Sequence, residues 1–322
     1  MLTSLLPSRH PFAAGLAAII SVASMPTAHA ASFGTGCYFN TQVIADGADA
    51  ITHTGEGCLG DLIQQRGTVV DQRWTGDEYV TQDFDQLART GVAGSAGLGV
   101  LHAYSGSFAQ STPMAKLFYY ANGEPGIIEN MARAEARSSL SSFWFDEITV
   151  QSAPVYGRVV LRFTITAHGK TSVLETTQGL ASFDTRLIAD DDRYADDLRL
   201  NVNGAGTASD DRGYWPGTKI RIYGELTARS SAYAGRVYGW PHNPLGYIAE
   251  SNSVADASNT AGFQIEVLTP GASYTSASGR SYVAMVPEPE TYALAAAGLA
   301  LISVFRPGRQ RRTERHPSDT AA

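Results

Sequence analysis

The stretch that decides the fold is Arg158-Val-Val-Leu-Arg-Phe-Thr-Ile-Thr166. Its apolar residues occupy every second position, at Val159, Leu161, Phe163 and Ile165. Because successive side chains of a β-strand point to opposite faces, this alternation predicts a half-buried strand with these four residues turned toward the core.

The same period of two recurs through the second half of the chain. In 219–226 it places Ile220, Ile222 and Leu226 on one face. Further strands are predicted at 182–189, 198–202 and 263–267, and over 134–150, where Ala and Arg residues at the start favour helix but the end continues the alternation.

Helical periodicity is scarce by comparison. Two short helices are predicted, at 59–65 and at 114–120, and the 32 glycines punctuate the remaining runs as turn residues do. Many short strands with few helices predict a mainly β protein, in the form of a single β-sandwich or jelly-roll-like domain.

The N-terminus reads as a secretory signal peptide over 1–30. Arg9 and His10 give a weakly basic start, 12–23 is an uncharged and mostly apolar stretch, and Ala28-His29-Ala30 offers small residues for a signal peptidase. We expect cleavage after Ala30, and a buried N-terminal helix is the alternative.

The C-terminus carries a second ordered set of signals. Val286-Pro287-Glu288-Pro289 precedes fifteen uncharged residues at 291–305. Such a helix would be about 22 Å long, against about 30 Å of bilayer hydrocarbon, so it predicts a transient membrane hold. A basic cluster follows, at Arg306, Arg309, Arg311 and Arg312, and by the positive-inside rule it stays cytoplasmic as a stop-transfer signal.

This order of motifs over 286–312 resembles the PEP-CTERM sorting signal of exported bacterial proteins, also called the ice-binding protein C-terminal domain. The resemblance implies recognition by exosortase, an integral membrane cysteine protease or transpeptidase, in a bacterium that makes exopolysaccharide. It divides the chain into a signal peptide (1–30), an extracytoplasmic β-sandwich (31–285), a sorting signal (286–312) with its transmembrane segment (291–305), and a tail (313–322).

Charge limits the partners of the body. Residues 31–285 hold 18 basic and 27 acidic residues, a net charge of −9. An acidic surface repels phosphate backbones, so we expect no nucleic-acid partner.

The chain has two cysteines, Cys37 and Cys58, both early in the exported part. An even number of cysteines outside the cytoplasm favours a disulfide. A metal site or free thiols are the alternatives, with His53 as the one histidine nearby.

An acidic stretch suggests calcium as the only candidate cofactor. Carboxylates in a flexible loop suit this ion, although neither EF-hand nor repeat-in-toxin spacing is present. The alternative is a solvated loop whose charges are balanced by neighbouring arginines. The candidate ligands are Asp190, Asp191, Asp192, Asp196 and Asp197.

Two tryptophan-proline segments are candidates for sugar contact. Trp215 in one, and Trp240, His242 and Asn243 in the other, combine flat rings with hydrogen-bonding groups. The alternative is that these rings cap the ends of the sandwich as a small core. No nucleophile elbow, zinc-protease motif or nucleotide loop is present in the sequence, so we expect no catalysis.

Together these features predict a non-catalytic protein, exported across the inner membrane, held there transiently and cut by exosortase. Its expected location is the cell surface or the exopolysaccharide matrix, with signal peptidase, exosortase and exopolysaccharide as partners. The alternative function is a secreted carbohydrate-binding module that uses the Trp215 and Trp240 loops.

Overall fold

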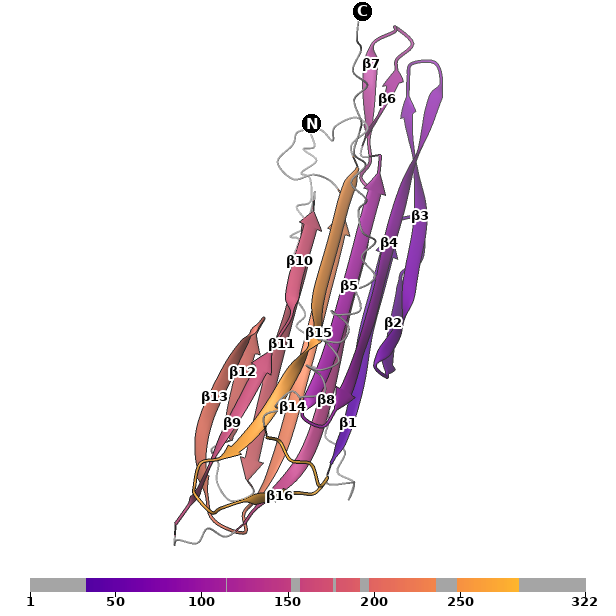
Figure 1. Ribbon diagram of the computed structural model, residues 1–322. Coiled ribbons are helices and arrows are strands. Elements are labelled where there is room, and N and C mark those ends of the chain that lie inside the picture. The colour runs from indigo at the N-terminus through magenta and orange to yellow at the C-terminus, as the bar shows by residue number, and fades with distance from the viewer. Residues whose placement is uncertain are drawn as a thin grey trace, which may run out of the picture. The chain divides into compact units, whose positions relative to one another are not determined.

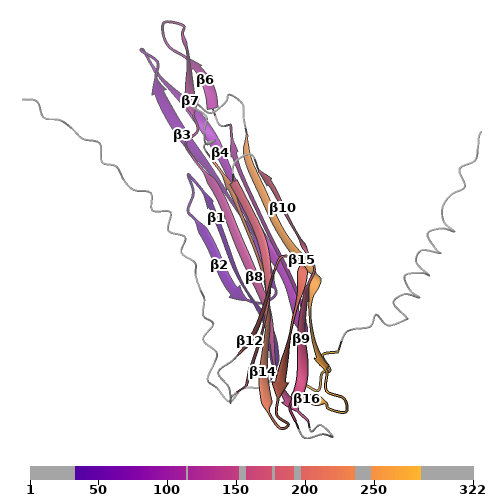
Figure 2. The same ribbon diagram turned by 90° about the vertical axis from the view of Figure 1, so that its left-hand side faces the viewer.

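The computed structural model describes residues 33–113, 115–151, 157–175, 178–191, 197–235 and 248–283, without the side chains of residues 61, 175 and 259. In this part of the chain every regular element is a β-strand. The strands form two antiparallel sheets that pack face to face, as Figures 1 and 2 show. The predicted β-sandwich is therefore confirmed.

Sheet A has the strand order β12-β11-β14-β8-β1-β2, and β16 pairs with the end of β8. Its strands are β1 (Gly34–Ala45), β2 (Ile51–Glu56), β8 (Ala134–Val150), β11 (Gln178–Asp191), β12 (Leu198–Asn203), β14 (Lys219–Ala234) and β16 (Tyr274–Ser276).

Sheet B has the order β13-β9-β15-β5-β4-β3, and β10 pairs with the first half of β15. Its strands are β3 (Leu59–Trp74), β4 (Tyr79–Gly97), β5 (Val100–Thr112), β9 (Val159–Ala167), β10 (Lys170–Glu175), β13 (Gly206–Tyr214) and β15 (Ala249–Val267).

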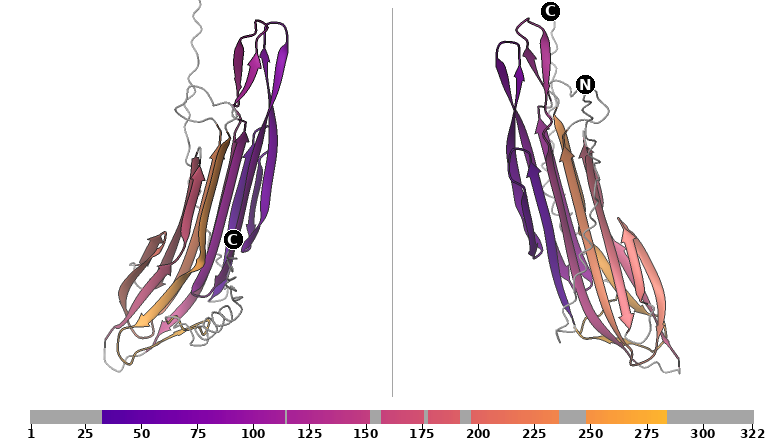
Figure 3. Two further views of the ribbon diagram at one scale, coloured as in Figure 1. Left: turned by 45° about the horizontal axis from the view of Figure 1, so that its top comes forward. Right: turned by 180° about the vertical axis from the view of Figure 1, so that it is seen from behind.

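A separate two-stranded hairpin consists of β6 (Ala115–Tyr119) and β7 (Pro125–Glu129). It lies beside the tip of the β3–β4 hairpin, as both views of Figure 3 show. The Ala121 amide donates to the Thr75 carbonyl at 3.0 Å and ties the two hairpins together.

The alternating segments form the strands that their pattern predicted. The four apolar residues of β9 that alternate in the sequence are completely buried. In β14, Ile220, Ile222 and Leu226 are buried on the same face. The ambiguous segment 134–150 is one continuous strand, β8, in the centre of sheet A.

The interior changes character along the sandwich. Around Trp144 it consists of large apolar side chains, and around Ala136 at the other end it consists mainly of alanines. Between these zones lies a layer of four buried serines, Ser105, Ser107, Ser138 and Ser230. Their hydroxyls bond one another across the two sheets at 2.7–3.3 Å, so these polar groups are satisfied without water.

The helix predicted at 59–65 is wrong, because this segment begins β3. A β-bulge between Gly60 and Ile63 shifts the register with β4. The extra residue places Leu59 and Leu62 on the exposed side while Ile63 is buried. A strand with a bulge therefore imitated the i, i+3, i+4 spacing of a helix.

The helix predicted at 114–120 is also wrong, because 115–119 forms β6. Phe118 lies opposite Gly126 of β7 and packs beside Phe84 and Ile128 in a small core. The turn that follows contains Gly123 at φ +83° and closes the hairpin. Cross-strand packing of aromatic residues outweighed the local helical spacing.

Candidate functional site

The outer face of sheet A carries flat aromatic rings in the centre of the sheet. Phe143 and Phe145 are outward-facing residues of β8, on either side of buried Trp144. Phe143 lies opposite Gly36 of β1, and Phe145 lies opposite Gly34. A Cβ atom added to either glycine would come within 2.7 Å of the opposing ring, so each ring lies across its glycine.

Two tyrosines extend this surface. The ring of Tyr223, on β14, is 6.2 Å from Phe143 with an interplanar angle of 24°. The ring of Tyr38, on β1, is 6.4 Å from Phe143 on its other side. We call Tyr38, Phe143, Phe145 and Tyr223 the aromatic platform.

A buried carboxylate anchors the platform. Glu225 is only 5% exposed although it is on the outer face of the sheet. It accepts a hydrogen bond from the Tyr38 hydroxyl at 3.2 Å and one from Thr227 at 3.3 Å, and it forms an ion pair with Arg186. Arg186 also lies over the Tyr223 ring at 5.6 Å, so one ion pair orients both tyrosines.

The pKa values follow from this burial. Burial raises the pKa of Tyr223, and the Glu225 charge raises it further. Burial likewise raises the pKa of Tyr38, with Glu225 again contributing. Burial works against the charge of Arg186, but Glu225 and Tyr223 together outweigh it, so the pKa of the guanidinium rises. Both tyrosines are therefore neutral hydrogen-bonding groups at neutral pH.

The charges around the platform are balanced by neighbours. Arg229 pairs with Asp184 at 2.9 Å, and Lys219 pairs with Glu147 at 2.8 Å. Burial raises the pKa of Asp184 and Glu225 adds to the rise, while Arg229 opposes it. The platform is thus a set of apolar ring faces framed by paired charges.

The predicted sugar contact Trp215 lies in the turn between β13 and β14 and is 44% exposed. Its carbonyl accepts from the Thr218 amide at 3.1 Å, and the Arg158 guanidinium is 5.6 Å above its ring. The neighbouring Tyr214 packs edge-on against Phe163 in the core. Trp215 is therefore exposed, whereas Tyr214 caps the interior.

The second tryptophan segment, with Trp240, His242 and Asn243, lies outside the described residues. It follows Gly235, beyond the end of β14, whereas Trp215 precedes the start of that strand. A sixteen-residue strand is about 50 Å long. Trp215 therefore stands about 50 Å from Gly235, the last described residue before the Trp240 segment.

The acidic stretch spans the sequence from the end of β11 to the residue before β12. Asp190 and Asp191 end β11, and Asp197 pairs with Arg199 at 3.2 Å. Asp192 and Asp196 lie outside the described residues. Within the part of the chain that the structure describes, no three His, Cys, Asp or Glu residues are grouped to hold a metal ion.

The predicted disulfide between Cys37 and Cys58 is confirmed. Cys37 is in β1, and Cys58 lies where the chain passes from β2, at the edge of sheet A, to β3, at the edge of sheet B. The Gly57 amide donates to the Cys37 carbonyl at 2.9 Å at the same place. The disulfide therefore holds the sandwich together on the side where the chain passes from one sheet to the other.

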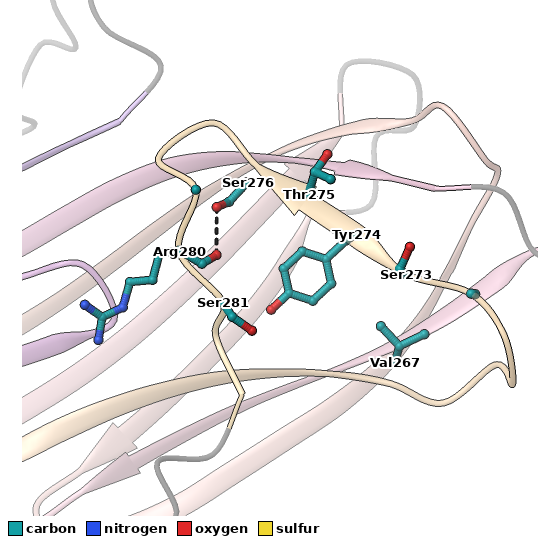
Figure 4. Close-up of a pocket in the computed structure, with 9 residues that line it drawn as sticks. Val267, Ser273, Tyr274, Thr275, Ser276, Arg280 and Ser281 are labelled. Atoms are coloured by element: carbon teal, nitrogen blue, oxygen red, sulfur yellow. Dashed lines mark hydrogen bonds between the residues drawn. The ribbon is translucent and has the colours of Figure 1, made fainter.

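A hollow of about 430 Å³ lies inside the loop that follows β15. Figure 4 shows the Tyr274 ring between Val267 and Ser281, with the Arg280 side chain directed away from it. The Ser276 hydroxyl donates to the Arg280 carbonyl, and the Tyr274 hydroxyl accepts from the Tyr282 amide at 2.8 Å. These polar groups serve the loop itself, so we place the candidate site on the platform.

The signal peptide and the sorting signal stay predictions, because 1–32 and 284–322 lie outside the described residues. These ranges include Val286, Pro287, Glu288 and Pro289 as well as the arginines from Arg306 onward. Among the residues that the structure describes, there is no helix of the length and apolarity that crossing a membrane requires.

No family model and no curated protein matches the chain. One solved structure, TmCBM61 in complex with beta-1,4-galactotriose, is 13% identical, over 50% of this chain and 88% of that one, with a TM-score of 0.19. At that TM-score the likeness supports no inference about fold or ligand.

Sequence reasoning missed the platform. Phe143-Trp144-Phe145 lies in a strand that was predicted, and its two outward rings could have been read from the alternation. Their glycine partners could not, because Gly36 and Phe143 are joined only by the register between β1 and β8. The outward aromatic pair was the available signal.

Proposed function

We propose that this chain is an exported, non-catalytic surface or matrix protein that binds neutral polysaccharide on the aromatic platform. The observation that carries the proposal is the flat packing of Phe143 and Phe145 across Gly36 and Gly34. Rings held parallel to a sheet present their faces to a ligand, and flat apolar faces stack on the C–H faces of sugar rings.

The surroundings favour a neutral ligand. The nearby ion pairs Arg186–Glu225, Arg229–Asp184 and Lys219–Glu147 satisfy charge within the protein. The platform is on an open sheet face and not in a closed cavity, which suits a segment of a long chain better than a small molecule.

Export and sorting form the second part of the proposal. The signal peptide would direct the chain across the inner membrane, and exosortase would cut near Val286–Pro289. The Cys37–Cys58 disulfide supports an oxidising destination. Mass spectrometry of the exported protein, from cells with and without exosortase, tests this part. Retention of residues 294–305 in the normal host would contradict it.

Affinity electrophoresis tests the binding proposal. Gels containing neutral glucan, mannan, galactan or xylan should retard the wild-type domain in at least one case. Phe143→Ala and Tyr223→Ala should each abolish most of that retardation, since each removes a ring face. Trp215→Ala is the matched control for a distant exposed ring and should leave retardation unchanged.

The outcomes separate the two sugar hypotheses. Loss in Trp215→Ala with full retardation in the platform variants would move the site to the β13–β14 turn. No retardation in any neutral polysaccharide would remove the binding function and leave the sorting proposal to its own test.

A further inference from the structure

A second hollow, of about 220 Å³, lies on the outer face of sheet B. Its floor is formed where Gly91 of β4 faces Gly106 of β5 directly in the ladder. Strands β4 and β5 run side by side in the centre of Figure 1. The two paired glycines have no side chains of their own, so neighbouring side chains lean over them and line a shallow depression.

Aromatic and polar side chains surround this floor. Tyr104 and Phe108 are the outward residues on either side of Gly106 along β5. A Cβ atom on Gly106 would lie 2.8 Å from the Tyr104 hydroxyl oxygen, so the tyrosine reaches over the glycine. Asn252 of β15, opposite Phe108, adds an amide to the wall.

Arg89 supplies the charge of the hollow. It is opposite Phe108 in the ladder, and its guanidinium lies 4.4 Å from the centre of that ring. Among the side chains that the structure describes, no carboxylate lies within ion-pair distance of Arg89, in contrast to the paired arginines around the platform. A guanidinium stacked on a ring keeps its N–H groups in its own plane, where they can bind a carboxylate through two hydrogen bonds.

We propose that this hollow binds a uronate residue of an acidic polysaccharide. The sugar ring would occupy the depression beside the Tyr104 ring that covers Gly106, with its carboxylate on Arg89 and a hydroxyl on Asn252. This site lies on the opposite sheet from the platform and takes a different class of sugar, so it goes beyond the function proposed above and does not depend on it.

Calorimetric titration of the full β domain with oligogalacturonate tests the proposal. Arg89→Ala should weaken binding by about tenfold or more, because a charge-assisted bidentate contact is lost. Arg89→Lys should recover only part of the affinity, since an ammonium cannot make the paired contact. The fully methyl-esterified oligomer, which keeps the ring but lacks the charge, should bind the wild type as weakly as the acid binds Arg89→Ala.

Two controls keep the result specific. Arg66→Ala removes another outward arginine, on neighbouring β3, and should leave the affinity unchanged. Gly91→Ala places a methyl group in the hollow while keeping Arg89, and should weaken binding. The added Cβ would be 3.4 Å from Leu62, an ordinary contact, so this variant should fold.

Several outcomes would overturn the proposal: no binding of oligogalacturonate by the wild type, wild-type affinity in Arg89→Ala, or equal affinity for a sulfated neutral oligosaccharide. The last would show general anion attraction. If the proposal for the aromatic platform is wrong, the result is different. The domain would then not be retarded by neutral polysaccharide, while its titration with oligogalacturonate would be unchanged.

Discussion

At the scale of single residues, Asp146 shows how a charge is accommodated inside the sandwich. This carboxylate on β8 is 2% exposed and belongs to the inward face, beside the large apolar core. It accepts hydrogen bonds from the Tyr282 hydroxyl at 2.6 Å and from the hydroxyl and amide of Ser278. Tyr282 also stacks on Trp144, with ring centres 5.0 Å apart. Asp146 therefore docks the final described segment onto the core.

Asp146→Asn should destabilise the domain by about 2 kcal/mol, since hydrogen bonds to a charged acceptor are replaced by weaker ones. The free energy of unfolding in denaturant measures the effect. Glu147→Gln, which breaks only a partly exposed pair with Lys219, is the matched control and should cost less than about 0.5 kcal/mol. If both variants lose less free energy of unfolding than this smaller value, the Asp146 carboxylate does not anchor the final described segment.

Tyr214 is one of the buried tyrosines that make stability fall at alkaline pH. Burial raises the pKa of Tyr214 from 10.0 in the unfolded chain to about 12, with the Asp191 charge adding to the rise. The contribution of this pKa shift to the free energy of unfolding is complete below pH 10. It is lost as the pH rises from 10 toward 12, because the unfolded chain releases the proton first.

Up to pH 9, the free energy of unfolding of Tyr214→Phe should therefore respond to pH as that of the wild type does. Between pH 9 and pH 11, it should fall by about 1 kcal/mol less than that of the wild type. Urea unfolding at these two pH values provides the comparison. Parallel losses in both proteins would show that Tyr214 titrates normally.

At the scale of elements, aromatic residues lie opposite glycines across neighbouring strands. Phe143 with Gly36 and Phe145 with Gly34 build the platform, and Trp144 lies opposite Gly224 in the core. In each pair the absence of a side chain on one strand makes room for a ring from the other. The glycines are therefore part of the candidate site, although they would not contact the ligand with a side chain.

Gly36→Ala should displace the Phe143 ring and weaken retardation by neutral polysaccharide by roughly two- to tenfold, the range expected for losing one ring contact. The domain should still fold, because the ring is on the outer surface. Gly262→Ala is the matched control, since a Cβ at this strand position meets nothing within 4 Å. Equal retardation of the two variants would contradict the role given to the Gly36 pair.

The disulfide acts on the crossing between the two sheets. Cys37 and Cys58 are 21 residues apart in the chain. Opening a loop of this length should cost about 3 kcal/mol in the chain-entropy model. The double variant Cys37→Ala/Cys58→Ala should therefore have a free energy of unfolding lower by this amount, as measured by unfolding in denaturant. Unchanged unfolding would mean that the β2–β3 crossing is held by packing and backbone hydrogen bonds alone.

Prediction from sequence succeeded for strands whose alternation is uninterrupted, such as β9, β12 and β14. It failed for β3 and β6, where a bulge and a short aromatic hairpin imitate helical spacing. A single sequence contains the period of each strand but not the extra residue that changes its phase, because the bulge is defined against the partner strand β4.

At the scale of the whole domain, the candidate site depends on the order of the strands in the sheet. This order cannot be read from the local sequence pattern. The platform combines residues of β1, β8 and β14. Tyr38 and Phe143, which lie close together in it, are more than a hundred positions apart in the sequence. Trp215 could be noticed from sequence because tryptophan beside proline in a turn is a local signal. The platform and the Gly91–Gly106 hollow could not, since pairing across strands creates both.

The two faces of the sandwich differ in charge around their aromatic residues. On sheet A, the arginines near the platform are paired with carboxylates, as in Arg186–Glu225. On sheet B, Arg89 is stacked on Phe108 without such a pair among the described residues. A protein with these two faces would hold a neutral glycan on one side and an acidic one on the other, which suits a component of a polysaccharide matrix.

The most direct measurement is a nuclear magnetic resonance titration of the labelled domain, residues 31–285, with a neutral oligosaccharide taken from whichever polysaccharide retards it. We predict that the shifted amide signals cluster on β1, β8 and β14 around Gly36, Phe143 and Tyr223, and that Phe143→Ala removes the shifts. Shifts confined to the turn around Trp215, or shifts that persist in Phe143→Ala, would contradict the claim that the aromatic platform is the binding surface.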